Sequence, residues 1–386
     1  MPRRPAARDR RPRPTVAARP SRRRRWPWFA ALAALLVAAV LVARVATRPT
    51  PERLALDAEA ALRDGDPAAS LAHFRAIEPA DAASLAGEAR ACLALGRASQ
   101  AESALVRACD LAPSAAEPWL LRLEILRLEG RTVEAQAVGA RAAAAVSTAD
   151  RRAILRAWTL ALLADAPDDL ARSTLDRWIA ADPDDLDALA ALARRRAEHP
   201  RAGDPGRPER IGSLSARLAR HPSHVNLREA LAAEQAETAD GPGFRSTLAG
   251  WPADARDARY LQLLGRWELD HGDPARAAIA LDAALRTLPH DWKARYRLAR
   301  ALGKLDRRPE ADAAALAVAR LRESLDPTTL GPKLEAALAR PDDPTLRHEL
   351  AELCNRVGLS GLARAWRREG LGSLTPDARP ARMLAR

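Results

Sequence analysis

One spacing of glycine, alanine, leucine and proline occurs twice in this chain, residue for residue. Counted from the glycine, alanine stands at +5, leucine at +9, alanine at +12 and proline at +17. The first copy consists of Gly96, Ala101, Leu105, Ala108 and Pro113, and the second of Gly272, Ala277, Leu281, Ala284 and Pro289. Glycine suits the turn that ends one helix, the alanines let the next helix pack closely, and proline stops that helix. The spacing therefore predicts the second half of a helical hairpin, present twice.

The two copies belong to a longer periodic pattern. Gly130 lies 34 residues after Gly96 and is followed by alanines at the same two offsets, and Ala311 lies 34 residues after Ala277. Weaker copies of the pattern occupy residues 65–77, 171–183, 210–222 and 358–370. A fixed period of this length is typical of stacked helical repeats rather than of a single globular core.

The pattern resembles the tetratricopeptide repeat (TPR) family, whose signature is W-x2-L-G-x2-Y, then A-x3-F, then P, at a period of 34. Trp119 matches the start of this signature, and Leu264 with Gly265 matches its Leu-Gly pair; Glu268 stands where the following aromatic residue is expected. The resemblance implies an all-α fold, an α-solenoid of TPR-like helical hairpins, in a membrane-anchored protein of bacterial type.

The composition agrees with a helical fold. Hydrophobic residues make up 48% of the chain and aromatic residues only 4%, because alanine and leucine dominate the apolar set. Both are strong helix formers. Runs of alternating β-branched and polar residues are absent, so we expect essentially no sheet.

The net charge of +12 is concentrated at the amino terminus. Residues 1–25 hold eleven arginines and one aspartate, so the remaining residues carry a balance of only +2. This tail has almost nothing to bury and is predicted to be disordered. Its arginines suit membrane topology and anionic headgroups, and because aromatic residues are not interleaved with them, nucleic acid is an unlikely partner.

An uncharged apolar run follows the tail, from Trp26 to Ala43. Its length approaches that of a membrane span, and the arginines before it place the amino terminus in the cytoplasm by the positive-inside rule. We therefore expect a transmembrane anchor at residues 26–47, with the repeats outside the cytoplasm, in the periplasm. A cleavable signal peptide and a soluble protein with an unusual helix are the alternatives.

Breaks in the pattern divide the rest of the chain. Residues 199–209 hold three prolines and two glycines, which separate a first TPR-like array at 53–198 from a second at 208–324. A C-terminal helical repeat and cap is expected at 325–374. The step from Ala311 to Ala363 exceeds one period by 18 residues, so an extra helix is expected around residues 333–339.

The chain shows no motif of a known catalytic or cofactor site. His221 and His224 form the only close histidine pair, at a predicted helix end where a solvated loop is favoured over a metal site. The acidic pairs at 168–169, 184–185 and 342–343 follow prolines, where carboxylates cap helices. We expect no enzyme activity, no cofactor and no metal. Core packing is favoured for the three cysteines, and a disulfide requires Cys92 and Cys109 to face each other.

The inner wall of the predicted solenoid carries the candidate binding site. In a TPR-like array this wall is lined by one face of the first helix of each hairpin. On two successive first helices this face presents Arg259, Gln262, Arg266, Lys293, Tyr296, Arg300 and Lys304. We call these residues the basic strip. Related repeat proteins hold peptide carboxylates with such residues, so the resemblance implies an acidic peptide or protein as partner. An ordinary solvated face is the alternative.

The predicted function is that of a non-catalytic, membrane-anchored scaffold that binds protein or peptide partners outside the cytoplasm. Two other functions fit the same features. One is an accessory subunit that docks an enzyme, and the other is a structural envelope protein that associates with itself.

Overall fold

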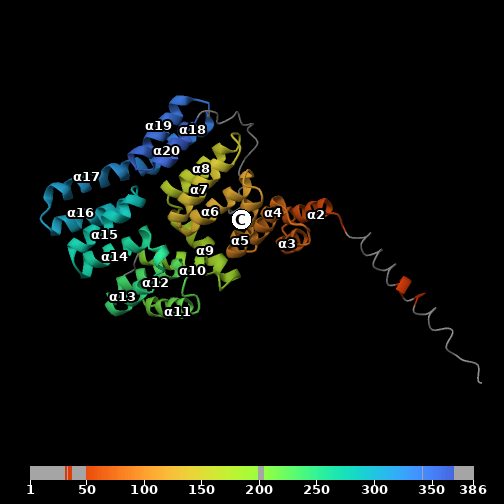
Figure 1. Cartoon of the computed structure of the whole chain (residues 1–386), viewed down its shortest axis with the longest axis horizontal. Coiled ribbons are helices and arrows are strands. Elements are labelled where there is room, and N and C mark those ends of the chain that lie inside the picture. The colour runs from red at the N-terminus through yellow and green to blue at the C-terminus, as the bar shows by residue number, and fades with distance from the viewer. Residues whose placement is uncertain (1–30, 33, 37–48, 199–203, 341, 369–386) are drawn as a thin grey trace, which may run out of the picture. The chain divides into compact units, whose positions relative to one another are not determined.

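The computed structural model describes residues 31–32, 34–36, 49–198, 204–340 and 342–368. Apart from one short 3-10 turn, the regular elements of these residues are α-helices (Figure 1). They are α2 (Pro51–Arg63), α3 (Pro67–Arg75), α4 (Ala82–Ala94), α5 (Ala98–Leu111), α6 (Ala116–Glu129), α7 (Thr132–Ala145), α8 (Arg151–Leu163), α9 (Asp168–Ala181), α10 (Leu186–Glu198), α11 (Arg207–Arg220), α12 (Val225–Glu237), α13 (Gly241–Ala249), η2 (Ala253–Ala255), α14 (Ala258–His271), α15 (Pro274–Thr287), α16 (Trp292–Lys304), α17 (Arg308–Leu325), α18 (Pro327–Ala339), α19 (Pro344–Arg356) and α20 (Ser360–Arg367). The predicted all-α class is confirmed.

The chain divides into two compact units, Met1–Arg53 and Leu54–Arg386. The helical repeats lie in the second unit. The expected array boundaries at 198 and 324 stay a prediction within this unit. The arginine-rich residues 1–25 lie outside the described residues, so their expected disorder stays a prediction as well.

The expected membrane localisation needs correction. Of the proposed anchor at residues 26–47, only residues 31–32 and 34–36 are described, and they are helical. A bilayer crossing needs about 20 consecutive apolar residues in one helix. Across the described ranges, no helix has both the length and the apolar character for such a crossing. This finding contradicts the expectation of a single-pass protein with extracytoplasmic repeats.

The first copy of the repeated spacing forms the hairpin of α4 and α5. Gly96 has a φ of 76° and follows the end of α4, while the Arg97 N–H donates to the Cys92 carbonyl at 2.8 Å. This bond closes the helix end in the manner of a Schellman motif, which requires a residue at positive φ. On α5, Ala101 and Leu105 are fully buried against α4 and its neighbours. Gly96 thus forms the turn and Ala101 packs closely against the preceding helix, as the sequence predicts.

The second copy forms the hairpin of α14 and α15 with a different turn. Gly272 has a φ of −132°, so it does not share the left-handed conformation of Gly96. Instead, the next helix is capped by Asp273, whose side chain accepts from the Ala275 N–H at 2.8 Å. Close approach of the two helices depends on Gly265, where an added Cβ would lie 2.6 Å from Leu281 Cγ. The Leu-Gly pair of the repeat signature therefore serves helix packing.

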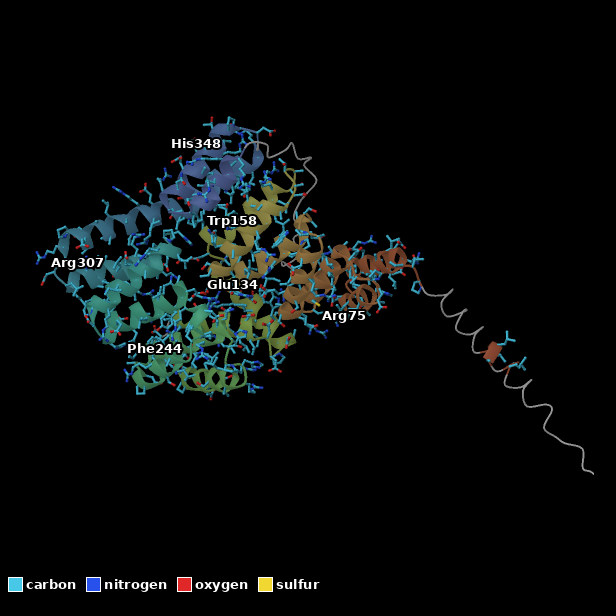
Figure 2. All side chains as sticks on the ribbon, in the orientation of Figure 1. Arg75, Glu134, Trp158, Phe244, Arg307 and His348 are labelled. Atoms are coloured by element: carbon cyan, nitrogen blue, oxygen red, sulfur yellow. The ribbon has the colours of Figure 1, made fainter. Side chains whose placement is uncertain are left out.

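The helices at the carboxyl end pack against the middle of the chain. Helix α18 contacts α8, and α20 contacts both α7 and α8 (Figure 1). One apolar cluster joins these elements and contains Trp158 and Trp366, whereas Phe244 belongs to a second cluster around α12 to α14 (Figure 2). Trp366 is fully buried, and its Nε1 donates to Thr159 Oγ1 at 3.1 Å. The last hairpin is therefore part of the folded core.

Replacing Trp366 by alanine should destabilise the whole second unit. The substitution removes a fully buried indole and the hydrogen bond that it donates to Thr159, so we expect a loss of about 3–5 kcal/mol in the free energy of unfolding. Urea unfolding followed by circular dichroism measures this loss. Arg364→Ala, at an exposed position of the same helix, is the matched control and should change little. An unchanged urea midpoint for Trp366→Ala would show that α20 does not belong to the core.

Candidate functional site: a cationic pocket between α14 and α16

Two capped helices position the basic strip. The Asp257 carboxylate accepts from the Arg259 N–H at 2.9 Å and starts α14, and the Asp291 carboxylate accepts from the Ala294 N–H at 2.9 Å and starts α16. Aspartate is favoured at this position because it satisfies backbone N–H groups that have no partner within the helix. The caps fix where each helix begins and hence which side chains share a face.

Four residues of the basic strip line one pocket of about 300 Å³. Three further residues complete its lining. The four are Arg266, Lys293, Tyr296 and Arg300, and the three are Asp270, Trp292 and Arg297. The pocket thus joins α14 and α16, and its lining holds four cations, two aromatic rings and one carboxylate. Tyr296 is 53% exposed, so a large aromatic surface stands open beside the cations.

The other three residues of the basic strip do not line this pocket. The Arg259 guanidinium pairs with Asp257 at 2.6 Å and donates to Asn226 Oδ1 at 2.7 Å. Gln262 Nε2 donates to Asp291 Oδ2 at 2.6 Å, and Lys304 Nζ donates to the Leu269 carbonyl at 2.7 Å. These side chains hold neighbouring helices together, so their donors are already used within the chain.

The pocket cations differ in how they are paired. Lys293 Nζ lies 2.8 Å from Glu198 Oε2, and an Arg300 Nη1 lies 3.8 Å from Asp270 Oδ1. Arg266 pairs with Glu237. In the described part of the chain, Arg297 has no ion-pair partner. A carboxylate that enters the pocket could therefore pair with the Arg297 guanidinium without displacing an acidic side chain of the described residues.

Burial and neighbouring charges shift the pKa of two pocket residues in opposite directions. For Arg266, burial lowers the pKa and the like charge of Arg297 lowers it further. For Lys293, burial opposes the charged form, but Glu198 outweighs it and raises the pKa. The positive charges of Arg266 and Arg297 therefore repel each other in the pocket. A bound anion would stabilise the charged form of both guanidinium groups.

The sequence analysis missed three of the lining residues, and two had a readable signal. Arg297 lies four residues after Lys293, which places both side chains on one helical face. Asp270 lies four residues after Arg266 in the same way. Trp292 is the first residue of α16, and its place in the pocket depends on the helix start that Asp291 sets.

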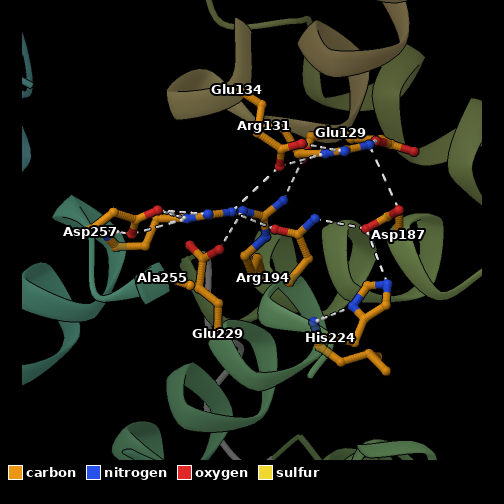
Figure 3. A network of polar contacts seen from close by, with 12 residues as sticks. Glu129, Arg131, Glu134, Asp187, Arg194, His224, Glu229, Ala255 and Asp257 are labelled. Carbon is orange, nitrogen blue, oxygen red and sulfur yellow. Dashed lines mark hydrogen bonds and ion pairs between the residues drawn. The ribbon is translucent and has the colours of Figure 1, made fainter. Parts of the chain in front are cut away.

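A buried ionic network occupies the interior next to this site (Figure 3). Its centre is Arg131, which is 7% exposed and contacts four carboxylates. The distances from its Nη atoms are 2.7 Å to Glu102, 2.8 Å to Glu129, 2.5 Å to Glu134 and 3.7 Å to Asp187. These acids come from α5, α6, α7 and α10, so one guanidinium links four helices.

The network continues from Arg131 to α12 and α14. Glu134 also lies 3.5 Å from Arg259, one of the three strip residues that do not line the pocket. Arg194 pairs with Glu229 at 2.9 Å and donates to the Glu129 carbonyl at 2.7 Å (Figure 3). Residues from both halves of the chain therefore share one set of charges. The charged residues of this network are paired with one another, so they are not available to a ligand.

The network shifts the pKa values of its members. Burial raises the pKa of Glu129 to about 8. The negative charges of Asp187 and Glu102 also raise this pKa, whereas the positive charge of Arg131 lowers it. The guanidinium pKa of Arg131 is raised well above its usual value because the surrounding carboxylates outweigh burial. For Glu134, burial opposes the charged form, but Arg131 and Arg259 outweigh it and lower the pKa.

Several polar residues singled out in the sequence have structural partners. The His224 Nδ1 accepts from the Leu227 N–H at 3.2 Å at the start of α12. Asp185 and Asp343 accept from backbone N–H groups at the starts of α10 and α19, as the capping interpretation predicts. The three cysteines, Cys92, Cys109 and Cys354, are buried and free. The possible disulfide between Cys92 and Cys109 is therefore not formed in this structure.

No protein-family model matches the sequence, and a comparison with curated proteins finds no match. Among solved structures, the chain is similar to one in the crystal structure of the APC/C hetero-tetramer Cut9-Hcn1, with 15% identity and a TM-score of 0.34. The match covers 78% of this chain and 55% of that chain, so this chain spans little more than half the length of that neighbour. The helical hairpins described above are themselves the evidence for a TPR-like fold.

Removing the titration of Glu129 should change how stability depends on pH. The pKa of Glu129 is raised from 4.5 in the unfolded chain to about 8 in the folded chain. Its contribution to stability is therefore fully present below about pH 4.5 and is lost as the pH rises through about 8. Glu129→Gln cannot lose a proton at this position. The free energy of unfolding of the variant minus that of the wild type should therefore increase as the pH rises from about 5 to about 8.

Urea unfolding of both proteins at several pH values in this range measures the difference. Titrating groups that do not interact with Glu129, such as His224 and His290, are common to the two proteins and cancel in this difference. A difference that stays constant with pH would show that Glu129 titrates as an ordinary carboxyl group.

Proposed function

We propose that this protein is a non-catalytic, TPR-like binding protein whose pocket between α14 and α16 holds an acidic segment of a protein partner. The observation that carries the proposal is the lining of that pocket, in which four cations face one carboxylate and Arg297 has no ion-pair partner among the described residues. Binding would act through shape and charge complementarity, and it requires no turnover.

Charge in the rest of the described chain supports this choice of site. On the inner face nearer the amino terminus, cations and carboxylates are matched, as in the pairs Arg90 with Glu117 at 3.1 Å and Arg127 with Glu124 at 2.8 Å. The Arg131 network is matched in the same way. A ligand at those places would have to break pairs within the chain, whereas at the pocket it meets Arg297, which has no ion-pair partner among the described residues.

The aromatic residues of the pocket favour a peptide over a simple anion. Tyr296 is exposed beside the cations, and Trp292 lines the same pocket with Arg322 stacked 5.2 Å from its ring centre. Aromatic side chains and arginine are the residues that contribute most to protein interfaces. We therefore expect the partner segment to combine carboxylates with at least one apolar or aromatic side chain.

Charge reversal in the pocket should abolish this binding. The probe is a fluorescein-labelled octapeptide of glutamates around one phenylalanine, and its anisotropy is measured with the full chain. Arg297→Glu combined with Arg300→Glu should weaken binding at least about tenfold, because two favourable charge pairs become repulsive. Arg276→Glu combined with Arg286→Glu is the matched control, since both arginines of α15 are 74% exposed and lie outside the pocket.

Photo-crosslinking identifies the residues of the chain that the peptide contacts. A benzophenone-labelled form of the same peptide is crosslinked to the full chain, and the modified segments are mapped by mass spectrometry. Crosslinks on α14 and α16 that disappear in the pocket variant support the proposal. Equal affinity of both variants, or crosslinks confined to the basic residues 1–25, would overturn it, and crosslinks only between two copies of the chain would favour self-association.

A further inference from the structure

A second cationic pocket lies on the other side of α16. It has a volume of about 600 Å³ and is enclosed by the loop before α16, by α17 and α18, and by the turn between α19 and α20. Three arginines line it, Arg295, Arg320 and Arg356, against a single carboxylate, Glu323. None of its residues belongs to the pocket between α14 and α16. It is therefore a separate site.

The three arginines have N–H donors that no other residue of the described chain uses. Arg295 donates once, from Nη2 to the Pro289 carbonyl at 3.3 Å, and its buried Nε has no hydrogen-bond partner. No ion pair is formed by Arg320 or Arg356 within the described ranges. By contrast, Arg307 lies 2.5 Å from Glu310, and Arg340 lies 3.8 Å from Asp343. Arg320 and Arg356 are exposed at the pocket, so their guanidinium groups are available to a ligand there.

The geometry of the chain creates this space. Helix α17 runs for 18 residues, and α18 follows after only Asp326, so an additional helix stands between the hairpin of α16 and α17 and the last hairpin. The two hairpins meet again where Gly358 approaches Pro289. Gly358 has a φ of 85°, and a Cβ there would lie 2.5 Å from Pro289 Cβ. One wall of the pocket therefore depends on a glycine at this position.

The lining combines charge with an apolar surface. Leu321 and Val357 are buried residues that face the pocket together with Ala317, and Ser324 and Thr329 add hydroxyl groups. Guanidinium groups bind carboxylates and phosphates through paired hydrogen bonds. The volume lies within the range of small-molecule sites, about 300–1,000 Å³. This combination fits a molecule with an anionic end and an apolar body.

We propose that this pocket binds a small amphipathic organic anion, a carboxylate or phosphate monoester with an apolar group. The arginines hold the anionic end, and Leu321 and Val357 contact the apolar part. Residues 1–25 carry +10, and residues 369–386 hold three arginines against two acidic residues, so neither segment has the charge of an occupant for this site.

Calorimetry on the full chain tests the proposal with three probes: phenyl phosphate, benzoate and inorganic phosphate. Phenyl phosphate or benzoate should bind, and phenyl phosphate should bind about tenfold more tightly than inorganic phosphate because its ring gains apolar contact. Arg320→Ala combined with Arg356→Ala should weaken this binding at least about tenfold, since two of the three anchoring charges are lost. The control is Arg308→Ala combined with Arg364→Ala, which removes the same charge from exposed positions outside the pocket.

A variant without a change in charge separates the pocket from general attraction to a basic protein. Ala317→Trp fills the cavity, and it should reduce binding of phenyl phosphate as strongly as the loss of the two arginines. Residues 1–25 are present in every variant, so their attraction for anions cancels in the comparison. Equal binding by all variants, or equal affinity for phenyl phosphate and inorganic phosphate, would overturn the proposal.

The outcome is independent of the peptide site. Arg297→Glu combined with Arg300→Glu changes only the pocket between α14 and α16, so it should leave phenyl phosphate binding within about twofold of the wild type. A loss of binding in this variant would place the anion in the other pocket and would contradict the assignment made here.

Discussion

The burial of Arg131 among four carboxylates constrains the rest of the folded unit. A buried guanidinium is tolerated only when its charge and its donors are satisfied, and here the partners come from four different helices. Removing any one of these helices would leave an uncompensated charge, so the network fixes their relative positions. Through Glu134 and Arg259 the same constraint reaches α14. Stacked hairpins, which otherwise contact only their neighbours, are thereby tied across 125 residues of sequence.

This internal pairing determines where a ligand can bind. Where cations and carboxylates are matched within the chain, an added anion gains little, because it must displace an existing partner. Each candidate site contains a cation that forms no ion pair in the described ranges, Arg297 in one and Arg320 in the other, and both sites use α16. Lys293, Arg297 and Arg300 face one pocket, and Arg295 faces the other. One helix with cations on two faces therefore supplies both proposed sites, and its start at Asp291 sets the register of each.

The sequence predicts the local features of this structure well. The hairpin of α4 and α5 follows from the glycine, alanine and proline spacing, and helix starts such as that at Asp343 follow from local capping chemistry. These predictions succeed because they depend on contacts between residues close in the chain. Four residues of the basic strip line one pocket, and their role in binding a partner stays a prediction.

Other features depend on contacts that no local pattern encodes. Arg259 has the same spacing as its neighbours on the strip, yet its partners Asn226 and Glu134 come from distant helices and draw it into the interior. Trp366 pairs with Thr159 across 207 residues, so its role in the core is invisible in the repeat pattern. Gly272 adopts an ordinary negative φ because Asp273 supplies the cap of the next helix by a different route.

Irregularity in a helical array is itself a source of binding sites. In a regular stack, each hairpin covers the apolar face of the one before it, and no space is left between them. The inserted α18 interrupts this stacking, so the ends of two hairpins meet only at Gly358 and Pro289 and leave a lined cavity beside them. Arg320 and Arg356, which form no ion pair within the described ranges, line this cavity. A break in phase thus leaves a volume in which an anion can reach unpaired guanidinium groups.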